Sequence, residues 1–177
     1  IQDVEKPVVG GVAGVKVQGD VAAVTVTDTK IVDLHSPGWV WGVVLAGSDS
    51  AEGSPANVTI QENAIGGLND GSRYDIDEGR DGMPYPGSAV GIDAGATAAA
   101  ATVRYNSLLA PNGAESKDEE TALDARCNWW GAKTGPTWEV DAEGEGTLAL
   151  ERGDATIEAE PWLVTPAPSR ACKGTEE

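Results

Sequence analysis

The sequence predicts an all-β fold, a parallel β-helix of about four rungs closed by a Trp-rich C-terminal segment. Residues 24–31, 58–65 and 101–108 align without a gap, and they share the pattern apolar, Thr, apolar, polar, a turn and then an aliphatic residue. A second set of aligned four-residue segments begins at residues 14, 42, 91 and 122. Strand segments that recur between insertions of variable length are typical of a solenoid, whose coils bury their apolar faces only against one another.

The second set of segments predicts which side chains face inward. Side chains of a strand alternate between two faces, so the interior is expected to receive Val15, Val43, Ile92 and Leu123. The outer surface is expected to receive Lys16, Val44, Asp93 and Asp124. A β-sandwich also has short alternating strands, but it gives no reason for aligned columns to match in residue type. The β-helix is therefore the favoured fold.

One column places Thr29, Asn63 and Asn106 at the bend between two strands. Asn tolerates the left-handed backbone of such bends, and its amide can bond nearby backbone groups. Stacked one rung apart, these side chains are expected to form a ladder like the amide ladders of cross-β assemblies. A neighbouring column on the outer surface is expected to hold Thr25, Thr59 and Thr102.

The 177 residues are expected to form one domain with a buried core. We expect rungs over residues 1–131, with a long insertion at 68–88, and a C-terminal cap and tail over 132–177. Residues 1–13 show no amphipathic helix that could cover the first coil, because Pro7 disfavours one. The uncovered first coil implies either that further residues precede it or that a partner adds its own strands by edge pairing.

The charge of the chain excludes several classes of partner. Twenty-nine acidic residues oppose 12 basic ones, for a formal net charge of −17. Such a surface disfavours binding to nucleic acids or to anionic membranes, which need a cationic patch, and no apolar stretch is long enough to span a bilayer. The acidic excess, the scarcity of Lys and the absence of Phe indicate a salt-adapted protein of the halophilic archaeal type. An ordinary acidic secreted protein is the alternative.

Two features predict an extracellular location. Cys127 and Cys172 are the only cysteines, and they are expected to form a disulfide, with free buried thiols as the alternative. A zinc site is not expected, because His35 is the only histidine and is distant from both cysteines. Asn57 begins an Asn-Val-Thr acceptor sequence for N-glycosylation.

The most specific motif lies near the C-terminus and consists of Asn128-Trp129-Trp130-Gly131, Gly135-Pro136 and Pro161-Trp162-Leu163. It resembles the closing segment of right-handed parallel β-helix proteins of the pectate-lyase-like superfamily, many of them secreted or cell-surface proteins of archaea and bacteria. The motif covers residues 121–163, and the strand pattern extends the resemblance over the whole predicted solenoid. Cys127 departs from it, since a polar or small residue is expected there. The resemblance implies the fold and the location but not an activity.

A physical role for the same segment can be predicted independently of the family resemblance. The last coil of a solenoid exposes an apolar cross-section and unpaired edge groups, which promote aggregation unless they are covered. Trp129 and Trp130 are large enough to cover such an end, and Trp162 is expected to pack beside them. Stacking of the same rings on sugars is the alternative.

Catalysis has one weak candidate pair. If Asp93 and Asp124 occupy the outer column on adjacent rungs, their backbones lie about 4.8 Å apart. Two carboxylates at such a distance suit a retaining glycosidase or a shared divalent cation. Lys16 lies lower in the column and Arg104 on another face, so no compact acid–base cluster follows. Catalysis is therefore left open but not favoured, and a solvated acidic face is the simpler explanation.

The insertion contains a candidate calcium site. Asp75, Asp77 and Asp81 alternate with other residues and glycines, and Ca²⁺ prefers such oxygen-rich loops. The loop lacks the downstream Glu of an EF-hand, so a solvated turn is the alternative. The loop at 68–88 is also a candidate contact surface. A further acidic stretch, residues 115–120, is expected to be solvated.

Two functions are compatible with these observations. The favoured one is a non-catalytic extracellular structural or adhesive subunit of a surface filament, cell envelope or virion spike, which self-assembles through its open end and loops into a homo-oligomer, filament or lattice. The alternative is a carbohydrate-active protein, either a polysaccharide lyase or hydrolase or a glycan-binding module.

Overall fold

The computed structural model describes residues 2–5, 11–36, 38–47, 53–68, 87–138, 145–167 and 172. In this part of the chain the structure is all-β, with a single 3-10 turn, η1, at Ala98–Ala100. The strands are β1 Gln2–Glu5, β2 Val12–Gln18, β3 Thr25–Thr27, β4 Lys30–His35, β5 Val40–Ala46, β6 Val58–Gln61, β7 Ala64–Leu68, β8 Ser88–Ile92, β9 Ala101–Arg104, β10 Ser107–Leu109, β11 Asn112–Ser116, β12 Leu123–Asp124, β13 Leu148–Glu151 and β14 Ile157–Glu158.

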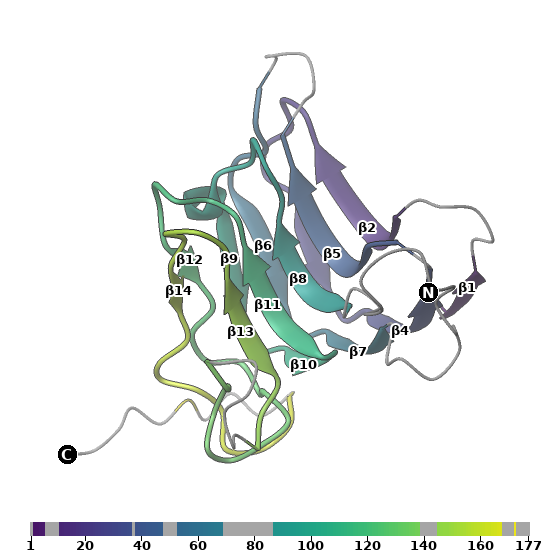
Figure 1. Cartoon of the computed structure of the whole chain (residues 1–177), viewed down its shortest axis with the longest axis vertical. Helices are drawn as coiled ribbons and strands as arrows, with labels where there is room; N and C mark the ends of the chain where they lie inside the picture. The colour runs from purple at the N-terminus through teal and green to yellow at the C-terminus, as the bar shows by residue number, and fades with distance from the viewer. Residues whose placement is uncertain are drawn as a thin grey trace.

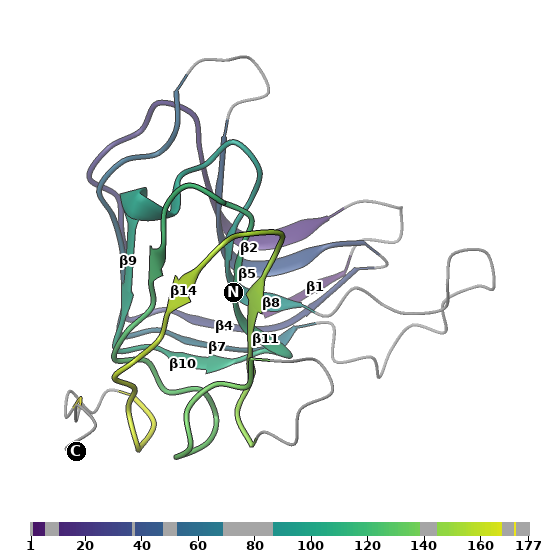
Figure 2. The same ribbon diagram turned by 60° about the vertical axis from the view of Figure 1, so that its left-hand side comes forward.

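The strands form three sheets in which all pairings between named strands are parallel. The first sheet has the order β1-β4-β7-β10, the second β13-β11-β8-β5-β2 and the third β14-β12-β9-β6-β3. From β1 to β12, each strand belongs to a different sheet from the strand before it, and each of β1 to β9 pairs with the strand three places further along the chain. Figure 1 shows the resulting stack, and Figure 2 shows the first sheet (β4, β7, β10) below the other two.

The predicted alignment of the first and third sheets is confirmed. Ile60 pairs with Val26 on one side and with Val103 on the other. In the first sheet Ile65 lies between Ile31 and Leu108. Ile31, Ile60, Ile65, Val103 and Leu108 are fully buried and belong to one core cluster. Like residues therefore stack on like residues along these two sheets.

The predicted alignment of the second sheet is correct for one pair of strands and wrong beyond it. Val15 pairs with Val43 as expected, but Val43 pairs with Val90 and not with Ile92. The next strand is β11, and the expected neighbour Leu123 lies in β12 of the third sheet. The sequence of β11, Asn-Gly-Ala-Glu-Ser, has no apolar alternation, so it gave no strand signal.

The strands of the second sheet share an irregularity at equivalent positions. The paired positions skip one residue on each strand, at Gly14, Gly42, Ala89 and Gly113. A Cβ at Gly14 would contact Ile31 and one at Gly42 would contact Ile65, so both positions face the core. Two successive residues then face inward, which breaks the period of two on which the predicted alignment relied.

The predicted amide ladder lies at the corner between the third and first sheets. Asn63 and Asn106 are buried, and the Asn106 Oδ1 accepts hydrogen bonds from the Asn63 backbone N–H at 3.0 Å and from its Nδ2 at 2.9 Å. Asn128 continues the ladder one rung further, because its Oδ1 accepts from the Asn106 N–H at 2.9 Å. At the other end the Thr29 N–H donates to the Asn63 Oδ1.

The left-handed residue at this corner is the one before the ladder residue. The residues before the ladder positions have φ between 50° and 58°, whereas the ladder asparagines themselves do not have positive φ; the former are Asp28, Glu62, Tyr105 and Cys127. The expectation that Asn itself adopts the left-handed backbone is therefore wrong. Its amide instead bonds carbonyls of the bend, as when the Asn106 Nδ2 donates to Ile60 O and Arg104 O.

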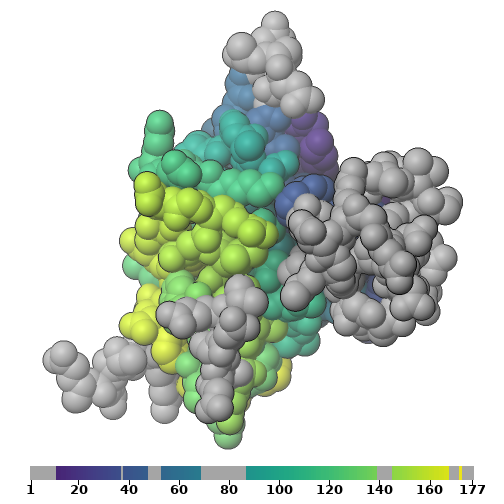
Figure 3. All heavy atoms as spheres, in the orientation of Figure 1, coloured from purple at the N-terminus to yellow at the C-terminus, as the bar shows by residue number. Residues whose placement is uncertain are grey.

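The sheets extend past the expected boundary at residue 131. β13 pairs with β11, and β14 pairs with β12. Trp130 is fully buried in the core cluster. Figure 3 shows the segment around β13 and β14, in yellow-green, as a continuous surface over the earlier strands. The C-terminal segment thus continues the stack, and part of it covers the end.

Candidate functional site

The outer face of the second sheet carries a pair of tryptophans. Trp39 precedes β5 and Trp41 lies within it, two residues apart, so both side chains lie on the same face of the strand. Their rings are parallel to within 6°, with centroids 5.9 Å apart. Both are only partly buried. The Lys117 Nζ lies 4.6 Å from the Trp39 ring centroid and 5.7 Å from that of Trp41, within range of cation–π attraction.

An ion pair fixes Lys117 above the rings. Its Nζ lies 2.8 Å from the Asp93 Oδ1. Asp93 follows β8 and Lys117 follows β11, and their backbone N–H groups donate to Leu45 O and Ile92 O of the preceding strands. The two side chains therefore occupy neighbouring positions on one face because the parallel register continues past the strand ends.

A shallow pocket opens beside the tryptophan pair. Its volume is about 270 Å³, and its lining includes Lys16, Trp39, Trp41, Val44, Ala46 and Asp93. Aromatic faces combined with a few charged groups are the usual lining of small-ligand sites. We call this surface, formed by Lys16, Trp39, Trp41, Asp93 and Lys117, the tryptophan face.

A buried polar cluster lies next to the tryptophan face. The Glu115 Oε2 accepts a hydrogen bond of 2.6 Å from the Ser88 Oγ, and its Oε1 accepts one of 3.1 Å from the Arg152 Nε. The Asn112 Nδ2 donates to the same Ser88 Oγ at 3.2 Å. Glu115 is 2% exposed, so the expectation that residues 115–120 are all solvated is wrong for it. Its two partners satisfy the carboxylate that burial would otherwise destabilise.

Glu115 shares a surface with Trp41. Ala114 belongs to the core, so the next residue, Glu115, faces outward, and it pairs with Gly91 of β8. A Cβ at Gly91 would lie 2.6 Å from the Trp41 Cδ1, so the indole rests on this glycine. The glycine thus makes room for the indole beside the buried carboxylate.

The two aspartates of the weak catalytic hypothesis lie on different sheets. Asp93 follows β8 in the second sheet, whereas Asp124 lies in β12 of the third sheet and pairs with Thr102. The proposed adjacency is therefore wrong, and the two carboxylates do not form a glycosidase pair or a shared cation site. The misassignment arose because Leu123-Asp124 matches the pattern of the second-sheet strands while occupying the third sheet.

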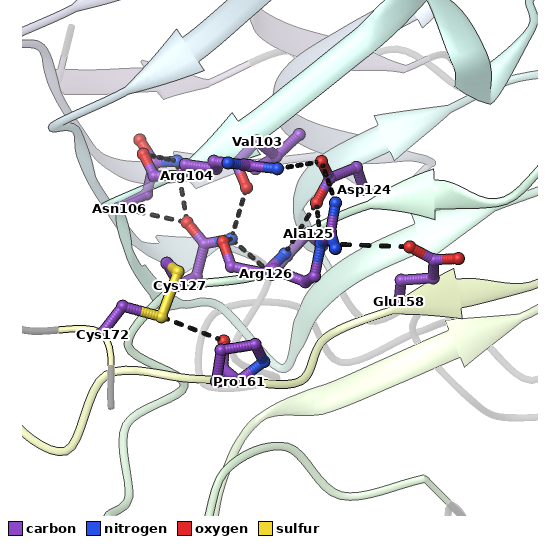
Figure 4. The surroundings of a disulfide bond; sticks show 11 residues. Val103, Arg104, Asn106, Asp124, Ala125, Arg126, Cys127, Glu158, Pro161 and Cys172 are labelled. Atoms are coloured by element: carbon purple, nitrogen blue, oxygen red, sulfur yellow. Dashed lines mark hydrogen bonds and ion pairs between the residues drawn. A yellow bond between two sulfur atoms is a disulfide. The ribbon is translucent and has the colours of Figure 1, made fainter. Parts of the chain in front are cut away.

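Asp124 is instead part of an ion-pair cluster on the third sheet. Its carboxylate accepts hydrogen bonds from Arg104 and from the Arg126 Nε, the latter at 2.9 Å (Figure 4). Burial by itself would raise the pKa of Asp124, but the hydrogen bonds from Arg126 and Arg104 outweigh it and lower the pKa from 3.8 to about 2. This carboxylate remains ionised and paired.

Asp118 has a similar structural role in the loop before β12. It accepts hydrogen bonds from the hydroxyls of Thr97 and Thr121 and, at 2.7 Å, from the Ala98 N–H. Burial opposes ionisation, yet these bonds and one from the Glu120 N–H lower the pKa of Asp118 from 3.8 to about 2. The side chain ties two successive rungs together.

The structure joins Cys127 and Cys172 in a disulfide, with an S–S distance of 2.13 Å (Figure 4). Cys127 occupies the left-handed position before Asn128 in the ladder corner. The Leu163 N–H donates to the Asn128 O, and Leu163 forms an antiparallel bridge with Cys172. The disulfide therefore attaches the C-terminal segment to the last rung of the ladder.

The three tryptophans of the expected cap have different environments. Trp130 lies in the core and contacts the Gly113 position, and its Nε1 has no hydrogen-bond partner among the described residues. Trp129 is partly buried and forms a parallel bridge with Ser107 of the first sheet. Trp162 packs on Gly135, and its Nε1 donates to Lys133 O at 3.0 Å. Trp130 is thus a core residue, and Trp162 fastens the loop that follows the last ladder residue.

The candidate calcium ligands Asp75, Asp77 and Asp81 lie outside the described residues, as does most of the expected contact loop at 68–88. Within the described ranges, no group of three or more His, Cys, Asp or Glu side chains is placed to hold a metal ion. The described part contains no helix long enough to cross a bilayer.

The comparisons with known proteins gave no match: no family model, no curated protein and no solved structure is similar to this chain. The tryptophan face and the Ser88–Glu115–Arg152 cluster were not predicted from the sequence. The spacing of Trp39 and Trp41 was an available signal, because residues two apart in a strand share a face. No local signal could have shown that Glu115 is buried.

Proposed function

We propose that this chain is a right-handed parallel β-helix of the pectate-lyase-like type that acts outside the cell as a non-catalytic structural or adhesive subunit. The strand order of the three sheets supports the architecture, and the disulfide supports an oxidising compartment. The subunit would belong to a surface filament, a cell envelope or a virion spike.

Assembly is proposed to occur through the N-terminal end of the stack, with a second copy of the chain as the partner. The main support for this proposal is a difference in burial between adjacent rungs. Val15 and Val24 of the first rung are only partly buried, whereas Val43 and Val58 of the next rung are 0% and 1% exposed. Among the described strands, β2 and β3 each pair on one edge only. Edge pairing with another chain would complete both the hydrogen bonds and the apolar contacts.

The assembly proposal is tested by a charged substitution at the open end. Val24→Lys places an ammonium at the proposed junction, and its long stem can still cover the core from a partly buried position. Leu109→Lys is the matched control, since Leu109 is 47% exposed on β10, away from that end. Electron microscopy and light scattering at the native salt concentration should show polymers for the parent and for the control but not for Val24→Lys. A parent chain that stays monomeric at high concentration would overturn the proposal.

A second candidate function, glycan binding, is favoured by the tryptophan face. Apolar faces of sugar rings stack on indoles, and the hydroxyls of a sugar could bond the carboxylate of Asp93 and the ammonium groups of Lys16 and Lys117. Trp39→Ala should abolish retention in affinity electrophoresis with the glycan that binds the parent. Trp138→Ala is the control, because Trp138 is 45% exposed elsewhere on the surface. Equal retention of both variants would exclude this candidate.

We also propose that the fold is adapted to a saline medium. The net charge of −17 destabilises a compact chain through self-repulsion in dilute buffer. Molar salt shortens the screening length to about 3 Å and removes most of that repulsion. Circular dichroism during dialysis to low ionic strength should show loss of the β signal. A spectrum unaffected by salt would contradict the adaptation but not the fold.

A further inference from the structure

The described asparagines fall into two groups. Asn63, Asn106, Asn112 and Asn128 are buried, with 0–2% of their surface exposed, and each side chain takes part in hydrogen bonds within the fold. Asn57 is exposed, and its amide has no hydrogen-bond partner among the described residues. The buried asparagines have a structural use for their amides, whereas Asn57 has none.

The backbone presents Asn57 outward at a corner. Its φ is 52°, and the residue at the equivalent bend of the preceding rung, Ala23, has a φ of 57°. Val58, which follows, is buried, and Pro55, two residues before it, is also buried. The chain is therefore anchored on both sides of a projecting asparagine. Since Ala adopts the same backbone one rung away, the turn itself does not require an amide.

The hydroxyl that completes the acceptor sequence also faces outward. Thr59 pairs with Thr25 of β3 and with Thr102 of β9, and these three residues form the outer Thr column of the third sheet. Thr25 and Thr102 are exposed, and Thr59 is partly buried. The core neighbours of Thr59 are Val58 and Ile60, which face the interior. Both groups required for recognition, the amide of Asn57 and the hydroxyl of Thr59, thus lie at the surface.

We propose that Asn57 is an N-glycosylation site that carries an oligosaccharide in the native protein. The donor class is a lipid-linked oligosaccharide phosphate, and the transfer is enzyme-catalysed. The Asn57 Nδ2 forms a bond to the anomeric carbon of the first sugar, and one amide proton is released. The bond between that carbon and the phosphate oxygen breaks, and the lipid phosphate leaves with the electron pair. The site adds a polar group to the outer surface at the corner that precedes β6.

The proposal is tested by mass spectrometry of the peptide that contains Asn57, from protein purified from its natural source. A mass increase made of sugar residues, localised to Asn57 by fragmentation, is the expected result. An unmodified Asn57 in the native protein would overturn the proposal.

Variants expressed in the same source separate recognition from folding. Thr59→Val should reduce glycan occupancy at Asn57 to background, while Thr25→Val, in the same outer column, should leave it unchanged. Asn57→Gly provides a second loss variant, because Gly accepts positive φ without strain, and circular dichroism should show an unchanged fold. Retention of the glycan in Thr59→Val, or its loss in folded Thr25→Val, would contradict the assignment.

Discussion

The ladder corner and the outer face of the second sheet differ in how their strands are held in register. At the corner, the amides of Asn63, Asn106 and Asn128 bond the backbone of adjacent rungs, so the side chains themselves specify which residues stack. On the second sheet, the pairing is instead interrupted at equivalent glycine or alanine positions on successive strands. The outward residues there differ from rung to rung, from Trp41 to Ser88 to Asn112.

This difference separates a repeated structural element from a variable surface. The ladder repeats asparagine from Asn63 to Asn128, because each amide oxygen accepts from both the backbone N–H and the amide of the preceding rung, and only its first step uses the backbone N–H of Thr29 alone. The second sheet needs only small residues at the irregular positions, so its outward side chains are free to form a specific surface. The tryptophan face and the buried Glu115 cluster lie on that variable surface.

Removal of one ladder amide should have the largest effect. Asn106→Ala removes the hydrogen bonds that the Asn106 amide makes with the Asn63 N–H, the Ile60 O and the Arg104 O. Because each unsatisfied buried group costs about 1–3 kcal/mol, the free energy of unfolding should fall by about 5 kcal/mol. The control Thr102→Ala, at an exposed position, should change it by less than about 0.5 kcal/mol. Urea unfolding at fixed ionic strength measures both, and a similar result for the two variants would contradict the predicted contribution of the ladder amide to stability.

Removal of the disulfide should lower the free energy of unfolding by nearly as much. The bond closes a sequence separation of 45 residues at the end of the ladder, and the chain-entropy relation gives a destabilisation of about 4 kcal/mol for the double substitution Cys127→Ser with Cys172→Ser. Hydrogen exchange should quicken first at the Leu163 N–H, which bonds the Asn128 O, and last in β5. Equal acceleration at both places would mean that the disulfide stabilises the whole stack and not only the end of the corner.

A larger side chain at one of the positions where the pairing of the second sheet is interrupted should disturb that sheet. In Gly42→Ala the new Cβ would overlap the Ile65 Cγ2 and would lie 2.6 Å from the Ala89 carbonyl oxygen. Overpacking of this kind costs about 3 kcal/mol. Gly11→Ala is the control, because its nearest contact would be 3.2 Å, and it should lower stability by less than about 1 kcal/mol. A Gly42→Ala protein as stable as the parent would show that the column tolerates larger residues.

The smallest predicted effect concerns acid pH and the third sheet. The pKa of Asp124 is lowered from 3.8 to about 2 in the folded chain. The stabilisation by its ionised form is therefore complete above about pH 4 and is lost as the pH falls from 4 through 2. Asp124→Asn should lower stability at pH 7 and flatten this part of the pH profile, leaving the contribution of Asp118. Urea unfolding between pH 2 and 7 at constant salt tests this, and parallel profiles for parent and variant would contradict it.

Sequence comparison within the chain predicted the pairing of β3, β6 and β9 and that of β4, β7 and β10, but in the second sheet it predicted only the pairing of β2 with β5. The pairings of Val26 with Ile60 and of Ile60 with Val103 could be predicted from the sequence, because equivalent positions keep the same residue class. The strand β11 could not be predicted from the sequence, since its buried residues are Asn, Gly, Ala, Glu and Ser. The hypothesis that paired Asp93 with Asp124 was wrong for a different reason. The local pattern of Leu123-Asp124 does not indicate which sheet the segment joins.

The sequence by itself determined the all-β class, the stacking of the first and third sheets, and the place of Asn63 and Asn106 at a corner. These follow from local chemistry, since apolar alternation and amide bonding act between residues that the repeat itself identifies. Only the tertiary structure decided the register of the second sheet, the burial of Glu115 and the meeting of Trp39 with Lys117. Those depend on contacts between residues far apart in the chain, and their partners are fixed only when the rungs stack.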